Sequence, residues 1–142
     1  MANCENLVGV TTEQIIESIE KILEAEKHYE RLRALAPDEK QAKVIDRLIA
    51  DQREAYRTVS KLYASITCNQ LIIPPLALPI FKTYLEGIKL AMFQELDENG
   101  RIILLYSSTT VLEIQEAMIA ILFKTYMHTT YLNYLLTINM CN

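Results

Sequence analysis

The chain has 142 residues, of which 51% are hydrophobic and 23% are charged, so it is long enough for one domain with a sizeable core but short for two. It holds 14 Lys plus Arg against 18 Asp plus Glu, a net charge of -4. Proteins that bind nucleic acid or an anionic membrane surface need a basic surplus, which this chain lacks. We therefore expect a single domain that has neither of these partners.

The cysteines and the apolar runs bear on the cellular compartment. Residues 1–10, MANCENLVGV, show no basic start and no apolar run of signal-sequence length. The longest apolar stretch, LIIPPLALPIF, carries three prolines and is too short to span a membrane. Cys4, Cys68 and Cys141 lack metal-ligand spacing, and their odd number does not suit a disulfide framework. These features predict a cytoplasmic protein with reduced thiols.

Apolar residues recur at spacings of three and four along most of the chain, which predicts four long helices. The first is expected over residues 12–36, opened by a capping box at Thr11. The second is expected over residues 39–67, opened by Asp38. Each carries an apolar stripe along one side, as expected of helices that pack around a shared core.

The second half of the chain repeats this pattern. A third helix is expected over residues 79–106, with Pro79 in its first turn, where proline is tolerated. A fourth is expected over residues 110–138, opened by a capping box at Thr110. The segment ahead of Pro79 contains two further prolines, so it cannot continue the second helix and forms a connector.

The lengths of the connections predict the topology. Very short turns join the first helix to the second and the third to the fourth, so each pair forms an antiparallel hairpin. The connector, about 11 residues at ~3.3 Å each, spans ~36 Å and just returns along the bundle. The predicted fold class is therefore all-α, an antiparallel four-helix bundle of ferritin-like topology with one long crossover between helices 2 and 3.

One segment also supports a different fold. DENGRIILLY places Asn99 and Gly100 ahead of an apolar run, which is a β-hairpin signal and predicts an α+β fold. The helix is preferred because the stripe with three-and-four spacing passes through this segment in register. A local irregularity is expected near Asn99, since glycine costs about 1 kcal/mol inside a helix.

Polar residues interrupt the apolar stripes near the middle of the predicted helices. They are Gln52, Glu95, Asn99, Thr125 and His128. A buried carboxylate needs a partner, so Glu95 and His128 are expected to contact each other. The simplest interpretation is a layer in which the other three complete a hydrogen-bonded network that fixes the register of the bundle.

From about residue 13 to residue 137 the chain resembles the rubrerythrin-like branch of the ferritin-like superfamily. Four segments carry the resemblance: KHYERLRALAPDEK, IADQREAYRTVSKLYASIT, LEGIKLAMFQELDENGRIILLYSST and FKTYMHTTYLNYLLT. In that family the first and third helices each give a Glu, and the second and fourth each give Glu-x-x-His, which together hold two irons. The resemblance therefore implies six ligand positions.

Only two of these six positions keep a ligand residue, Glu95 and His128. A dinuclear iron site needs bridging carboxylates, so the resemblance implies a metal-free relative with no expected cofactor and no peroxidase, oxidase or iron-storage activity. The other four positions are substituted. Ile22 and Thr125 each stand where the family has a Glu, and Gln52 and Ala55 stand where it has the Glu and the His of the second helix.

Other chemistries lack their motifs. The chain has no glycine-rich phosphate loop, no Gly-x-Ser-x-Gly and no Cys-x-x-Cys. Its histidines are His28 and His128, and His28 lies in the charged stretch EKHYERLR, where it is expected to be solvated. No catalytic residue is therefore predicted.

Three functions follow from these observations. The first is a non-catalytic binding or structural protein of unknown specificity. The second is an iron- or manganese-dependent redox protein that uses a residual site at Glu95 and His128 with further ligands that the sequence does not identify. Glu54 and Glu26 are possible substitute ligands for an alternative mononuclear site. The third is a small-molecule carrier whose vacated centre forms a pocket between the helices.

Charge is distributed unevenly along the chain. Residues 1–70 hold 12 acidic and 10 basic residues, whereas residues 71–142 hold 6 and 4. The third and fourth helices are apolar beyond one core stripe, which implies a second buried face. We expect residues 102–136 to be buried in a homodimer formed through these helices, with Phe123 and Leu104 as candidate interface residues.

Overall fold

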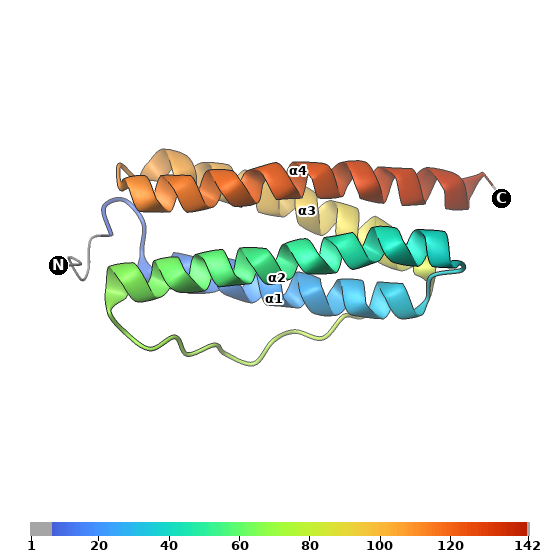
Figure 1. Cartoon of the computed structure of the whole chain (residues 1–142), viewed down its shortest axis with the longest axis horizontal. Helices are drawn as coiled ribbons and strands as arrows, with labels where there is room; N and C mark the ends of the chain where they lie inside the picture. Colours follow the sequence, from blue (N-terminus) through green and yellow to red (C-terminus); the bar gives the residue numbers. More distant parts are fainter. Residues whose placement is uncertain (1–6, 142) are drawn as a thin grey trace.

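Four long helices make up nearly all of the structure, a computed structural model that describes residues 7–141. They are α1 (Thr12–Ala34), α2 (Glu39–Thr67), α3 (Tyr84–Ser108) and α4 (Leu112–Met140). α1 packs against α2 and α3, and α4 packs against α3 and α2. Figure 1 shows α1 and α4 running in one direction and α2 and α3 in the other. The predicted all-α bundle of two antiparallel pairs is confirmed, and no helix in the described chain is long and apolar enough to cross a membrane.

Side-chain caps fix the starts of the first two helices, as predicted. The Thr11 hydroxyl accepts a hydrogen bond from the Gln14 amide (3.2 Å), and the Gln14 side chain accepts one from the Thr11 amide (2.8 Å). The Asp38 carboxylate accepts from the Gln41 amide at 2.8 Å. α1 ends at Ala34, slightly before the expected end, because its last turn tightens ahead of the proline.

α3 begins later than predicted, at Tyr84 rather than at Pro79. The Thr83 hydroxyl accepts a hydrogen bond from the Glu86 amide (3.2 Å), and the Glu86 carboxylate accepts one from the Lys82 amide (2.9 Å). The first amides of a helix have no carbonyl partner within the helix, and a cap side chain can accept a hydrogen bond from one of them. Proline has no side-chain acceptor and cannot play this role. The Thr83 cap therefore decides where α3 begins.

The predicted capping box at Thr110 is also wrong. α4 follows Val111, which makes no side-chain cap hydrogen bond. Thr109 organises the turn instead, because its hydroxyl accepts from the Val111 amide (3.1 Å) and its carbonyl accepts from the Gln115 side chain (2.8 Å). α4 then runs to Met140, slightly beyond the predicted end.

α3 continues without a break through Asn99 and Gly100, so the β-hairpin alternative and the expected irregularity are both wrong. Asn99 is buried on the core side of the helix, and the buried Ile102 and Leu105 follow it at helical spacing. The burial of these side chains is lost if the segment turns back on itself, which explains why the helix prevails over the local turn signal.

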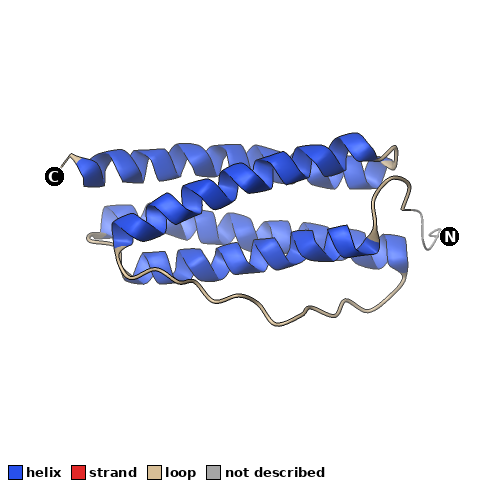
Figure 2. Ribbon diagram, turned by 180° about the vertical axis from the view of Figure 1, so that it is seen from behind, coloured by secondary structure: helices blue, strands red, loops and turns tan. Residues whose placement is uncertain are grey.

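The connector covers residues 68–83 and runs along the outside of the α1–α2 hairpin (Figures 1 and 2). Its far end is anchored on α1. The Arg31 guanidinium donates two hydrogen bonds to the Phe81 carbonyl (2.9 and 2.7 Å) and lies 5.2 Å from the centre of the Phe81 ring. The Phe81 side chain is buried. These contacts fix where the crossover returns to the bundle.

One of the two described cysteines differs from the expectation of reduced thiols. Cys68, the left-handed C-cap of α2, is in a disulfide, whereas Cys141 is free and exposed. Cys4 lies outside the described residues. Spacing along the chain does not give the distance between sulfur atoms on which disulfide formation depends. The argument for a cytoplasmic location from reduced thiols therefore no longer holds.

The apolar core is divided into two clusters. One occupies the end of the bundle near the α3–α4 turn and includes Ile15, Ile19, Val59, Ile114 and Met118. The other occupies the end near the α1–α2 turn and includes Leu32, Ile45, Leu48, Ile88 and Leu132. The polar residues of the middle of the helices lie between them, so the core is apolar at both ends and polar at its centre.

Two glycines of α3 are expected to respond oppositely to substitution by alanine. A Cβ at Gly87 would lie 2.5 Å from the Phe81 ring, whereas a Cβ at Gly100 would meet nothing within 4 Å. Gly87→Ala should lower the free energy of unfolding by about 1–3 kcal/mol through overpacking. Gly100→Ala should raise it by about 0.5–1 kcal/mol, because alanine costs less backbone entropy in a helix. Urea denaturation of both variants tests this, and a shift of the same sign for both would contradict the packing described.

Candidate functional site

A chain of hydrogen bonds crosses the centre of the bundle and uses residues from all four helices. The Tyr29 hydroxyl of α1 donates to Glu95 Oε1 of α3 (2.5 Å). His128 Nδ1 of α4 lies 3.2 Å from the same oxygen. His128 Nε2 lies 3.0 Å from Asp51 Oδ2 of α2. The expected contact between Glu95 and His128 is therefore present, and it belongs to a longer network.

The other expected members of the layer differ in their roles. Gln52 joins it, since its side-chain amide lies 3.3 Å from His128 Nδ1, and toward a protonated Nδ1 this amide must present its oxygen. Thr125 is buried but its hydroxyl donates to the Leu122 carbonyl of its own helix (2.9 Å). Asn99 is buried, and its Oδ1 has no hydrogen-bond partner. The expectation that all three complete the network is correct for Gln52 alone.

Two members of the network were not identified from the sequence as partners. Tyr29 lies in an apolar stripe, where a buried hydroxyl needs a hydrogen-bond acceptor. That requirement could have identified Tyr29 from the sequence as a member of the network. Asp51 lies one residue before Gln52 and off the core stripe, and its side chain is 20% exposed. Because a helix turns about 100° per residue, only the position of α4 in space shows that Asp51 reaches His128.

The protonation of the network follows from its charges. Burial lowers the pKa of His128, but the hydrogen bonds and charges of Glu95 and Asp51 outweigh it, so this pKa is raised above its ordinary value. Burial, followed by the charge of Glu95, raises the pKa of Tyr29 well above 10.0. A protonated imidazole donates from both nitrogens and keeps no lone pair for a base or a metal. The arrangement thus favours an imidazolium fixed between two carboxylates.

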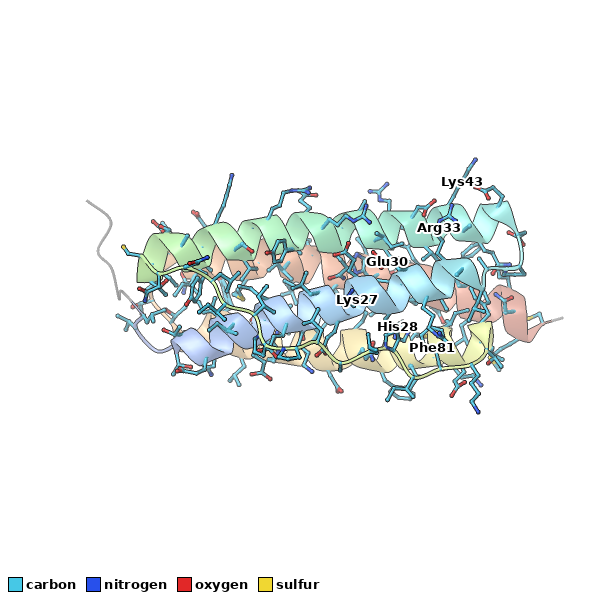
Figure 3. The ribbon with its side chains drawn as sticks, turned by 90° about the horizontal axis from the view of Figure 1, so that it is seen from below. Lys27, His28, Glu30, Arg33, Lys43 and Phe81 are labelled. Carbon is cyan, nitrogen blue, oxygen red and sulfur yellow. The ribbon has the colours of Figure 1, made fainter. Side chains whose placement is uncertain are left out.

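His28 is not solvated, contrary to expectation. It is buried, its Nε2 lies 2.8 Å from the Gly87 carbonyl, and its ring lies 4.5 Å from the Phe81 ring (Figure 3). Burial lowers the pKa of His28, opposed by the hydrogen bond to the Gly87 carbonyl. The neutral ring therefore donates a hydrogen bond from α1 to α3 beside the anchored end of the connector.

The two histidines should give opposite pH dependences of stability. The lowered pKa of His28 means that its contribution is present above pH 6.5 and is lost as the pH falls below it. The raised pKa of His128 means that its contribution is present below pH 6.5 and is lost as the pH rises through the raised value. The stability difference between wild type and His28→Gln should shrink toward acid, and that between wild type and His128→Gln should shrink toward alkali. Differences that do not change with pH would contradict the assigned protonation states.

A cavity of about 90 Å³ lies beside the network and is bounded by all four helices. Each water needs roughly 10–15 Å³ of such space, so the cavity can hold several waters or one small molecule. Exposed Lys21 of α1 and Gln94 of α3 contribute to its lining, so it reaches the surface there. All six positions that the resemblance marks as ligand positions line it: Ile22, Gln52, Ala55, Glu95, Thr125 and His128.

These side chains do not fit a pair of iron ions. Of the six, only Glu95 is a carboxylate, whereas two bridged metals need several. His128 directs both ring nitrogens at carboxylates and offers neither to a metal. Glu54, a substitute ligand suggested by the sequence, pairs with Lys124 (2.6 Å), and Glu26 pairs with Arg53 (2.7 Å). Among residues 7–141, no three His, Cys, Asp or Glu side chains are grouped so as to hold a metal.

Comparison with known proteins gives no match: neither a family model, nor a curated protein, nor a solved structure is similar to this chain. The four-helix all-α architecture is therefore established by the structure alone. The resemblance of the sequence segments to rubrerythrin-like proteins receives no support from these comparisons.

Proposed function

We propose that this chain is a non-catalytic, metal-independent relative of the rubrerythrin-like ferritin-like proteins that binds a small molecule at its centre. The observation that carries the proposal is the convergence of six positions from four helices on one cavity. Two hairpins joined by a long crossover are also the connectivity expected of that superfamily.

The side chains at the centre do not support the alternative of a metal-dependent redox protein. A redox site built on Glu95 and His128 requires a free imidazole nitrogen, and both nitrogens lie within 3.2 Å of a carboxylate oxygen. The substitute carboxylates are held by cations at the surface. Binding without redox chemistry is therefore the function that the arrangement supports best.

The unpaired groups of the cavity indicate what kind of molecule fits it. The Tyr29 hydroxyl and both His128 nitrogens already contact the carboxylates of Glu95 and Asp51. Glu95 Oε2 is buried and has no hydrogen-bond partner. An unpaired buried acceptor is costly, so an occupant that donates a hydrogen bond to it is favoured.

The cations of the lining do not offer a site for an anion. Lys21 pairs with Glu24 at 3.4 Å, and Lys124 pairs with Glu54 at 2.6 Å. An anion would have to displace these carboxylates and approach Glu95. The favoured ligand is therefore a small ammonium or primary amine, whose N–H groups and charge both suit a carboxylate.

Thermal unfolding with methylammonium chloride, potassium chloride or potassium acetate at equal millimolar concentration tests this proposal. Methylammonium should raise the Tm of wild type and of Glu54→Gln, a surface control, and acetate should not. Glu95→Gln should abolish the gain, and calorimetric titration below its Tm checks this variant directly. An equal gain with acetate, or no gain with methylammonium, would contradict the proposal.

A further inference from the structure

Exposed apolar side chains are concentrated on one half of the bundle. Of the 18 large hydrophobic residues exposed in the described chain, 13 lie on α3 or α4 and none lies on α2. The most exposed of those on the two helices are Phe123 (72%) and Phe93 (69%). The uneven distribution shows that α3 and α4 carry a second apolar face in addition to the one that fills the core.

On α4 this face is a stripe that follows one side of the helix. Ile119, Phe123, Tyr126 and Tyr134 are exposed at helical spacing, whereas Thr125 and His128 between them are buried. No Asp, Glu, Lys or Arg occurs in the rest of α4 after Lys124, which is turned toward α2 by its pair with Glu54. The stripe is therefore uncharged over four helical turns.

α3 extends the same face sideways. Because Glu95 contacts His128, neighbouring residues of α3 and α4 lie at the same level along the bundle. Because the two helices are antiparallel, the exposed Leu96 of α3 is thus level with the exposed Met127 of α4, while Phe93 and Phe123 lie on either side of this level. We call the exposed apolar side chains of these two helices the outer face.

The outer face is more than a set of scattered single residues. It holds 13 exposed large hydrophobic side chains on two neighbouring helices, whereas apolar residues scattered singly are the normal state of a monomer surface. The face lacks the basic rim that attracts a membrane, since exposed Lys89 is accompanied by exposed Glu86, Asp97 and Glu116.

We propose that the outer face binds the outer face of a second copy of this chain, giving a twofold-symmetric dimer. In a twofold interface each patch meets itself, so a charged stripe would repel its own copy and an uncharged one does not. The stripe of α4 satisfies this requirement from Ile119 to Tyr134.

Sedimentation equilibrium at micromolar concentration tests the proposal with Phe123→Glu, Phe93→Glu and a control, Ala50→Glu, at an exposed site of α2. Wild type and Ala50→Glu should be dimers. Each Phe→Glu variant should weaken the dimer by at least about 100-fold, because it buries an unpaired charge. Unchanged far-ultraviolet circular dichroism would show that the variants are folded.

The proposal would be overturned by a monomeric wild type, including one that binds anionic vesicles instead, or by a dimer whose affinity changes less than threefold in both Phe→Glu variants. Loss of the dimer in the Ala50→Glu control would place the interface on α2 and would overturn it equally. The outcome does not depend on whether the central cavity binds an amine.

Discussion

Replacing Ile22, Gln52, Ala55 and Thr125 by Glu, Glu, His and Glu is expected to give a protein that melts far below wild type without metal and recovers with ferrous iron. The four positions face one cavity with Glu95 and His128. Unpaired buried carboxylates are costly or take up protons, so the metal-free variant is destabilised. Iron restores stability because it binds only the folded site.

The same variant with Glu95→Gln added is the matched control. It carries the same destabilising groups but lacks one ligand, so it should recover far less with iron. Wild type should be indifferent to iron. Thermal unfolding under anaerobic conditions measures all three proteins, and a quadruple variant that folds but gains nothing from iron would show that the six positions do not act as one site.

Glu95→Ala should cause the largest loss of stability of any single substitution in the network. It leaves the Tyr29 hydroxyl and the His128 imidazolium buried without their shared acceptor. Removing one partner of a buried charged pair typically costs about 3–5 kcal/mol. Urea denaturation measures the change in the free energy of unfolding.

Glu54→Ala provides the comparison for this loss, because it also removes a carboxylate from an ion pair, but at the surface. The Glu54 side chain is 60% exposed in its pair with Lys124. Exposed ion pairs contribute little, since water screens both charges. Equal losses for Glu95→Ala and Glu54→Ala would contradict the claim that the central network organises the core.

The four helices and their pairing could be predicted because their information is local or periodic. Thr11 and Asp38 cap α1 and α2 within a few residues of sequence, and the apolar stripes mark the core side of each helix. The start of α3 could not be predicted as well. Pro79 and Thr83 both suit a helix start, and only the hydrogen bonds of Thr83 distinguish them.

The centre of the bundle was predictable where a polar residue interrupts a stripe, as Glu95, His128 and Gln52 do. Partners that lie off the stripe depend on how the helices are placed in space. Asp51 reaches His128 across 77 positions of sequence, and His28 is buried because Phe81 of the connector covers it. No local sequence pattern contains either contact. The charged residues around His28 therefore led to the wrong prediction that its side chain is solvated.

The central claim, that the converging positions form a metal-independent centre, is tested most directly by elemental analysis of protein purified from its native host without chelators. The account predicts iron and manganese well below one equivalent per chain. About two equivalents of either metal per chain, with the absorption of a bridged pair, would contradict it.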